Sequence, residues 1–505
     1  MRRLAAVVAG AAAGAASLAP LWAHLHVALA GGGLSPAQQR AFFLPWQLAD
    51  NVVSGRGPWD ASVFAWGGEA GLLAIYGNPG VAALLAPLHV LLAPIPAHAV
   101  GLAALVASNA IALAWAGANA RTIVLGAAIG AGAGWWGGQL GAGALAAGWA
   151  APGLALWATG GRGAGAIALG VVGALVAPVP TAAGVVAALL DPPDRARGAW
   201  GPPLLGVAAL AVVIRALAPP LGAGAGIVSI QAVVWPAGGV AIGAPSAASI
   251  GIAAALADRG GRRLLAAVAV VAALAATGPW AVDAGGEALT VGAFKVPLFP
   301  WSLGGLRTEL MAAAILLGQI AAFQLLSAWA PGVWAAAALC LAEAPAQAMA
   351  GQPVGIWTGA RWVIPPAIAD ARRAPRVRVF LQLPAAALQE LAVAYVPFHQ
   401  QRVVGGTDGG VLAAALAAKA AADPTVGALV NVGNIGLGAE PHPITPRLME
   451  LGFTDVVVFG PDPGTLAAVQ LIFGRADAEH GVATVWRLRS GRRGGWDGPP
   501  PSDAP

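Results

Sequence analysis

The side chains with the clearest chemical potential lie in one polar and aromatic stretch, residues 34–87. The surrounding sequence is mostly Ala, Gly, Leu and Val, so this density of polar groups predicts a use for them. Carboxylates can act as general bases or as ligands of a divalent cation, and polar and aromatic side chains can line a binding site. The candidates for the first role are Asp50, Asp60 and Glu69, and those for the second are Gln38, Trp46, Trp59, Trp66 and Tyr76.

Each of these candidates also has a purely structural interpretation. Asp50 precedes Asn51 at a predicted helix end, and Asp60 can cap a helix over residues 61–66. The tryptophans can form a belt at a membrane surface, where amphipathic rings collect without any ligand. The sequence leaves both interpretations open.

Two arginines stand apart from the other basic residues. Arg215 lies near the end of one apolar segment, and Arg307 begins another. A charged group at such a depth costs several kcal/mol unless it reaches the interface or has a partner. Because a guanidinium fork suits phosphate oxygens, capture of an anionic lipid phosphate is the alternative to simple snorkelling.

The composition indicates a membrane protein. Of 505 residues, 58% are hydrophobic and 10% are charged, whereas about 25% charged is ordinary for a soluble domain. The net charge of +5 comes mostly from arginines, many of them in short loops between apolar runs, which is typical of loops facing the cytoplasm. We therefore expect the lipid bilayer, and no nucleic acid, as a partner. The single cysteine, Cys340, excludes an intramolecular disulfide.

Residues 1–350 predict an α-helical polytopic membrane domain of about eleven spans. The first apolar run, to Ala30, is longer than a signal-peptide core, so we expect an uncleaved span. The later spans are predicted at 97–118, 122–138, 142–159, 164–190 (two short helices broken at Pro178 and Pro180), 202–218, 238–257, 264–281, 307–327 and 331–347. The basic clusters of the short loops then share one side, which predicts a cytoplasmic N-terminus and a first extracytoplasmic loop over residues 32–80.

Residues 351–489 predict a small extracytoplasmic α/β domain, because charge returns to an ordinary density there. Strands are expected at 377–383, 455–459 and 482–488, and helices at 385–392, 411–421, 446–451 and 465–473. Residues 490–505 have no apolar period and predict a disordered tail. No metal site is assigned to six of the seven histidines: His24, His26, His89 and His98 lie in or near apolar runs, and His399 and His442 lie far apart in sequence.

The order of these features resembles the GT-C class of glycosyltransferases, in particular bacterial polytopic members with a C-terminal extracytoplasmic α/β domain. The matching pieces of the first loop are Pro45-Trp46, residues 54–59, Gly67-Gly68 and Tyr76-x-x-Pro79. Those of the membrane domain are Trp149-x-x-Pro152, the turn at 175–181 and the outer stretch leading to Arg307. Those of the C-terminal domain are residues 381–384, Tyr395, His399-Gln400 and Gly405-Gly406.

The resemblance implies an inverting glycosyltransferase of the cytoplasmic (inner) membrane. Such an enzyme moves a sugar from a polyprenyl-phosphate-linked donor to a cell-envelope acceptor at the outer face. It needs a carboxylate, an aromatic wall for the sugar and cations for the lipid phosphate. The loop carboxylates, the loop aromatics and the two arginines would fill these roles, and a divalent metal, Mg or Mn, stays open as a cofactor.

One departure from the family pattern affects the enzymatic interpretation. Where the family carries its catalytic acid, this chain has Gln38, which cannot take a proton or hold a metal as a carboxylate does. Two alternatives therefore stay open: a non-catalytic envelope assembly or binding protein that keeps the scaffold and, with less support, a transporter. Transporters concentrate polar groups at the bilayer midplane and often have repeated halves, whereas here polar groups gather at one face.

Overall fold

The computed structural model describes residues 1–17, 36–76, 80–132, 140–190, 193, 201–217, 228–229, 280–284, 287–291, 307–328, 332–335, 337–338, 371–372, 379–383, 395–404, 411–430, 444–459, 463–480 and 483–489. Its contacts divide the chain into two compact units. The helical unit comprises Met1–Gly33 and Gly77–Trp362, and the α/β unit comprises Leu34–Tyr76 and Val363–Pro505. The stretch predicted as the first outer loop therefore belongs mostly with the C-terminal region.

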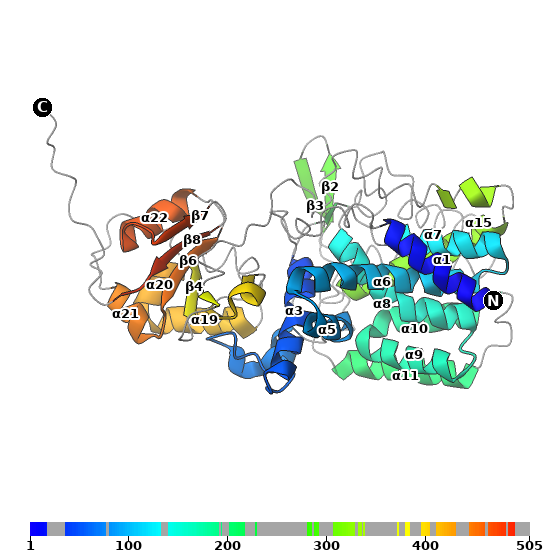
Figure 1. The fold of residues 1–505 in the computed structure, drawn as a ribbon, viewed down its shortest axis with the longest axis horizontal. Coiled ribbons are helices and arrows are strands. Elements are labelled where there is room, and N and C mark those ends of the chain that lie inside the picture. The colour runs from blue at the N-terminus through cyan, green and yellow to red at the C-terminus, as the bar shows by residue number, and fades with distance from the viewer. Residues whose placement is uncertain are drawn as a thin grey trace, which may run out of the picture. The chain divides into compact units, whose positions relative to one another are not determined.

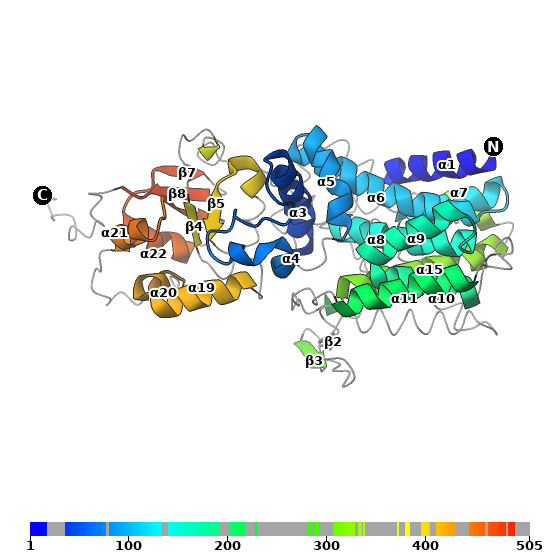
Figure 2. The same ribbon diagram turned by 90° about the horizontal axis from the view of Figure 1, so that it is seen from below.

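The helical unit is a bundle of apolar helices packed side by side (Figures 1 and 2). Its helices are α1 (Arg2–Ser17), α5 (Val81–Leu91), α6 (Pro94–Ala116), α7 (Ala120–Gly132), α8 (Leu140–Thr159), α9 (Ala164–Val176), α10 (Pro178–Leu190), α11 (Gly201–Leu217) and α15 (Arg307–Ala328). Helix α6 packs against α1, α7 and α8, while α8 also contacts α9, α10 and α15. A three-stranded sheet follows the order β1 (Val228–Ser229), β2 (Trp280–Ala284) and β3 (Glu287–Val291).

Basic residues of the N-terminus and the first short loop meet at one end of this bundle, which we call the basic end. The Arg2 guanidinium donates from Nε to the Gly117 carbonyl oxygen at 3.1 Å, just after α6 ends. The Arg3 guanidinium lies 5.8 Å from the centre of the Trp115 ring. Arg121 follows in the first turn of α7. The N-terminus and the first short loop thus lie at the same end of the bundle.

Helices α6, α8 and α15 run in the same direction. Near one end, an added Cβ at Gly148 of α8 would meet Leu105 of α6, and Ala147 of α8 clusters with Ala312 of α15. Further along all three helices, Asn109 of α6 bonds to Gln319 of α15, and the Trp157 and Phe323 rings of α8 and α15 meet edge to face at 6.1 Å. The C-terminal ends of α6 and α8 therefore lie at the same end of the bundle. Arg162, just after α8, follows them to the basic end.

A buried polar pair joins three of these helices. The Asn109 amide of α6 donates to the Gly130 carbonyl of α7 at 2.9 Å and to the Gln319 amide oxygen of α15 at 3.2 Å. The Gln319 amide in turn donates to the Ile129 carbonyl at 3.3 Å. Such bonds hold apolar helices together, because an unpaired amide in their midst is costly. The sequence pattern places the polar groups at one membrane face and does not predict this buried pair.

Glycines let helices α8 and α10 approach each other closely. A Cβ added at Gly184 would lie 2.3 Å from the Cα of Gly153, closer than real Cβ atoms come to backbone. The backbones thus pack directly against each other at this crossing, as small residues allow between apolar helices.

Replacing Gly184 by alanine is expected to lower the stability of the helical unit by about 1–3 kcal/mol, because the helices must separate to admit the methyl group. Gly206 in α11 is the matched control, since its added Cβ would meet no atom within 4 Å. Gly206→Ala should be neutral or stabilising by up to about 1 kcal/mol through helix propensity. Melting temperatures of the two variants in detergent check the difference, and equal shifts would show that the crossing tolerates a side chain.

The outer surface of the helical unit is unusually apolar. Its exposed large hydrophobic side chains are Met1, Leu4, Val7, Val8, Leu84, Val90, Leu91, Leu92, Leu169, Val171, Val172, Leu175, Val186, Leu189, Leu190, Leu205, Val212, Val213 and Trp334. Among the described residues, α6 alone is both long and apolar enough to cross a membrane. The predicted count of about eleven spans is not confirmed. Helices of 13 residues, such as α7, reach only about 20 Å, against a hydrocarbon core of about 30 Å.

Most of the described helices lie where the sequence predicts them. Seven of the predicted spans correspond to α6, α7, α8, α9, α10, α11 and α15, and the chain breaks before Pro178 as expected. The sequence missed α5. The predicted span at 238–257 and residues 264–279 of the span predicted at 264–281 lie outside the described residues. Trp280 and Ala281, predicted to end that second span, belong to strand β2. Of the first predicted span, Arg2–Ser17 is helical and the remainder lies outside the described residues.

The α/β unit is built on a mixed five-stranded sheet in the order β5-β4-β6-β8-β7. Its strands are β4 (Val379–Leu383), β5 (Arg402–Val404), β6 (Asp455–Phe459), β7 (Ala478–His480) and β8 (Ala483–Arg487). Strands β5, β4 and β6 are parallel, whereas β8 is antiparallel to both β6 and β7. Its helices are α3 (Pro36–Val53), η1 (Gly68–Ala70), α4 (Gly71–Tyr76), α19 (Val411–Ala422), α20 (Pro424–Val430), α21 (Ile444–Glu450) and α22 (Pro463–Phe473).

Strand β6 forms the centre of this unit, as its unbroken run of valines predicts. Val456 and Trp486 pair on one face of the sheet, and Val457 and Val485 pair on the other; all four are buried. The predicted strands 377–383 and 482–488 and helices 411–421, 446–451 and 465–473 are also present within a few residues. Strands β5 and β7 and helix α20 were not predicted. The predicted helix at 385–392 and the tail at 490–505 lie outside the described residues.

Candidate functional site

Residues 63–65 extend the sheet of the α/β unit beyond strand β5. The Val403 amide donates to the Val63 carbonyl, and the Ala65 amide donates to the Val403 carbonyl, both at 2.8 Å. Phe64 and Val403 thereby form a parallel bridge. The predicted outer loop is therefore an integral part of the C-terminal fold, attached through backbone hydrogen bonds.

Aromatic contacts strengthen this attachment. Phe42 of α3 stacks on Phe398 at 5.9 Å, and Trp66 meets Phe453 edge to face at 5.1 Å. Trp46 is buried in the same unit. Of the loop tryptophans proposed from the sequence as a sugar wall, Trp46 and Trp66 thus help to pack the α/β unit, whereas Trp59 is exposed.

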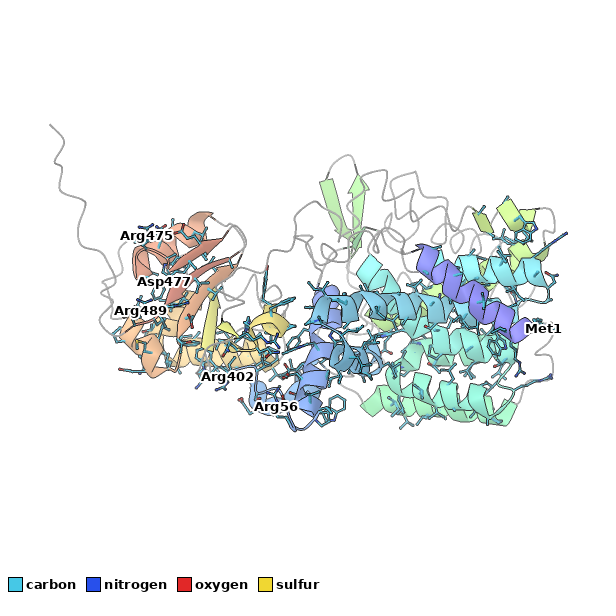
Figure 3. All side chains as sticks on the ribbon, viewed as in Figure 1. Met1, Arg56, Arg402, Arg475, Asp477 and Arg489 are labelled. Atoms are coloured by element: carbon cyan, nitrogen blue, oxygen red, sulfur yellow. The ribbon has the colours of Figure 1, made fainter. Side chains whose placement is uncertain are left out.

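The three loop carboxylates have separate surroundings. Asp50 forms an ion pair with Arg56. Figure 3 labels Arg56, which lies in the turn after α3. Asp60 Oδ1 accepts a hydrogen bond from the Ser62 amide at 2.6 Å, and residues 61–66 form turns instead of the helix that Asp60 was expected to cap. Glu69 is exposed in η1. The described contacts do not bring these carboxylates together around one point.

A buried asparagine organises the turn that carries these residues. Asn51 Nδ2 donates to the Pro58 carbonyl at 3.1 Å and to the Asp60 carbonyl at 2.7 Å. The Gln47 amide donates to Asn51 Oδ1 at 2.7 Å. The turn is thereby fixed to the end of α3.

Replacing Asn51 by alanine is expected to release this turn, because two carbonyls lose their donor and each lost bond costs about 1 kcal/mol or more. Trypsin cleavage after Arg56 should then become about tenfold faster, since about 1.4 kcal/mol of local stability corresponds to a factor of ten. Ser54→Ala, at an exposed site of the same turn, is the control. Equal cleavage of both variants would contradict the role given to Asn51.

His399 is a buried, neutral histidine next to Phe398, the residue that stacks on Phe42 of α3. Its Nδ1 accepts a hydrogen bond from the Gln401 amide at 2.9 Å, and the Gln401 side chain donates to the Ala371 carbonyl at 2.7 Å. Burial lowers the pKa of His399 from 6.5 to about 3. The neighbouring Phe398 carries the stack onto Phe42, so protonation of His399 would disturb the contact that holds α3.

The remaining residues selected from the sequence are placed only by their backbone. Gln38 lies in α3 and Tyr76 ends α4, both in the α/β unit. Arg215 lies in the last turn of α11 and Arg307 begins α15, both in the helical unit.

A buried carboxylate lies at the end of the helical unit opposite the basic end. Glu309, in the first turn of α15, is 4% exposed. Its Oε2 accepts a hydrogen bond from the Val179 amide, in the first turn of α10, at 3.3 Å. The N-terminus of a helix favours a negative charge, so α10 stabilises the carboxylate of Glu309.

Trp149 of α8 lies beside the same helix starts. Its side chain packs against the cluster of Ala147, Ala312 and Ile315, and Ala312 lies one turn after Glu309. Trp149 and Val176, which ends α9, both pack against Leu85 and Leu105. A Cβ added at Gly80 would lie only 3.1 Å from the Trp149 ring. Helix starts and loops from four distant parts of the chain therefore meet here. We call Gly80, Trp149, Val179, Thr181 and Glu309 the Glu309 cluster.

Two polar atoms of this cluster have no hydrogen-bond partner within the described part of the chain. These are the Trp149 indole Nε1 and the Thr181 hydroxyl, both shielded from solvent. Buried polar atoms normally find partners, and those that do not require an explanation.

Glu309 was not selected from the sequence, although a signal for it exists. It is the single acidic residue of the predicted span 307–327 and follows Arg307 by two positions. An ionisable residue within an apolar segment is by default a candidate functional residue.

Within the described ranges, no three His, Cys, Asp or Glu side chains gather in a way that could hold a metal ion. No protein-family model matches the chain, and no curated protein matches its sequence.

Proposed function

We propose that the chain is a polytopic membrane glycosyltransferase of the GT-C type. It would transfer a sugar from a polyprenyl-phosphate-linked donor to a cell-envelope acceptor at the outer face of the cytoplasmic membrane. The observation that carries the proposal is the Glu309 cluster. Three stretches similar to the GT-C pattern, the Trp149 segment, the turn at 175–181 and the start of α15, are distant in sequence and meet around one buried carboxylate.

The surface and charge of the helical unit support its placement in a membrane. Its exposed side chains are largely apolar, as in a bundle surrounded by lipid. The arginines of the basic end favour the cytoplasm, which would place the Glu309 cluster toward the outer face.

The α/β unit is formed by two separate segments of the chain, and this supports the proposed orientation of the C-terminus. Residues 34–76 follow the first predicted span, residues 363–505 follow the last, and the two stretches fold together. They must therefore lie on the same side of a membrane. This requires an even number of crossings between residues 77 and 362, as eleven spans in all would give.

In the proposed reaction, an acceptor hydroxyl oxygen attacks the anomeric carbon of the donor sugar. The bond from that carbon to the phosphate oxygen breaks, and its electron pair leaves with the lipid phosphate. Glu309 takes the proton of the attacking hydroxyl, as a general base. A single displacement inverts the anomeric configuration. Trp149 Nε1 and the Thr181 hydroxyl would hold sugar oxygens, and Arg215 and Arg307 would hold the phosphate.

Transfer by the purified chain in lipid vesicles tests this proposal. Labelled polyprenyl-phosphate sugars of several identities are offered with an envelope glycan acceptor, and a labelled glycan is the expected product. Binding of the donor without transfer would favour the non-catalytic protein to which Gln38 points. Solute flux across the vesicles without transfer would favour a transporter.

A further inference from the structure

The turn after α3 exposes apolar side chains on the otherwise ordinary surface of the α/β unit. Val52 is 61% exposed, Val53 is 67% exposed and Trp59 is 38% exposed. Pro58 is exposed beside them. We call these four residues the apolar tip. The other exposed large hydrophobic side chains described in this unit, Met449 and Leu471, are far from the tip in sequence.

The apolar tip is held rigidly. Beyond the Asn51 side-chain bonds to the Pro58 and Asp60 carbonyls, the Arg56 amide donates to the Asn51 carbonyl at 2.8 Å. The Trp59 carbonyl accepts from the Leu72 amide at 2.8 Å. A rigid apolar surface loses little conformational entropy when it is covered, so the turn is preorganised for binding.

The charged side chains beside the tip have bonding partners. Arg56 pairs with Asp50 at the end of α3, and Asp60 Oδ1 accepts a hydrogen bond from the Ser62 amide at 2.6 Å. Arg56 and Asp50 therefore need not enter an apolar environment as unpaired charges, which would cost several kcal/mol.

We propose that the apolar tip inserts into the interface of a lipid bilayer and anchors the α/β unit there. The turn is bonded to α4 through Leu72, and only residues 77–79 separate α4 from Gly80 of the apolar helical unit. A tryptophan with small apolar neighbours is the composition that membrane interfaces favour. The inference rests on the membrane placement in the proposed function, but not on sugar transfer.

Site-specific fluorescence in lipid vesicles tests this anchoring. In the full-length chain with Cys340→Ala, an environment-sensitive probe is attached through Val53→Cys, Leu84→Cys or Leu471→Cys, one at a time. Leu84 is 53% exposed on α5 of the helical unit and reports membrane embedding; Leu471 is 43% exposed on α22 and is the matched control for the tip. The vesicles contain phosphatidylcholine and phosphatidylglycerol, with or without brominated acyl chains.

We expect brominated lipid to quench the probe at position 53 at least about twofold more than the probe at 471, with a blue-shifted emission. Quenching of the probe at 84 with equal quenching of the probes at 53 and 471 would overturn the anchoring and leave the membrane placement intact. The apolar tip would then be assigned to the binding of a protein partner instead. Absence of quenching at 84 would instead contradict the membrane placement on which both proposals depend. An unchanged tryptic pattern shows that each labelled variant is folded.

Discussion

Replacing Glu309 by glutamine is expected to reduce sugar transfer by about 10²–10⁴-fold, the range that a general base contributes. Glutamine keeps an oxygen that can accept the Val179 amide hydrogen bond, so the junction between α15 and α10 should persist. It cannot take the proton of the acceptor hydroxyl. The turnover rate should therefore fall while the melting temperature in detergent and the affinity for the lipid-linked donor stay nearly unchanged.

Two further variants make this result interpretable. Glu309→Ala should lose transfer and also stability, because the Val179 amide would lose its buried partner. The Asp50→Asn and Asp60→Asn double variant should keep transfer, since Asp50 already pairs with Arg56 and asparagine can cap the Ser62 amide. Full transfer by Glu309→Gln would reduce Glu309 to a helix cap. Loss of transfer in the double variant would return the reaction to the loop carboxylates.

Acid is expected to loosen the α/β unit through His399. The pKa of His399 is about 3 in the folded chain and near 6.5 when unfolded, so the unfolded chain binds the proton first as pH falls. The contribution of His399 to the free energy of unfolding is fully present above pH 6.5. It falls by about 1.4 kcal/mol for each pH unit between pH 6.5 and pH 3. Hydrogen exchange of strand β6 at pH 7 and pH 4.5 measures the loss, since protection there reports the core of this unit.

His399→Asn is the control for this pH dependence. The asparagine oxygen can accept the Gln401 amide hydrogen bond, as in a common turn, but it does not titrate in this range. Its pH dependence should be flatter than that of the native chain between pH 6.5 and 4.5. The lowered pKa of Asp423, caused by its bonds to Arg447 and to the Thr425 and Val426 amides, affects stability only below about pH 4. Identical slopes in the two proteins would rule out His399 as the source.

Local patterns were enough to predict the centre of each unit. The unbroken β-branched run of β6 requires burial on both faces, and Pro178 ends α9 because it cannot continue a helix there. Strands β5 and β7, of three residues each, are too short to give a period. Helix α5 was missed because it is short and contains Pro87.

The site could be predicted less well than the elements. Periodicity cannot show that Phe64 pairs with Val403 or that Trp149 lies beside the start of α15, since these contacts join distant parts of the chain. The sequence therefore predicts an outer loop for the polar stretch, much of which packs within the α/β unit. Glu309 has a signal of its own, a charge within an apolar span, but Asp50, Asp60 and Glu69 form a denser cluster of candidates in the sequence.

The bridge between Phe64 and Val403 also determines when the α/β unit can be completed during synthesis. Residues 34–76 leave the ribosome hundreds of residues before the strands they join. This early segment can therefore pair with strand β5 only after residues 77–362 of the helical unit have been synthesised. A recombinant fragment beginning at residue 363 would lack the segment that covers β5, leaving a bare backbone edge that invites aggregation. The C-terminal region is thus expected to stay monomeric and soluble only when produced together with the early segment.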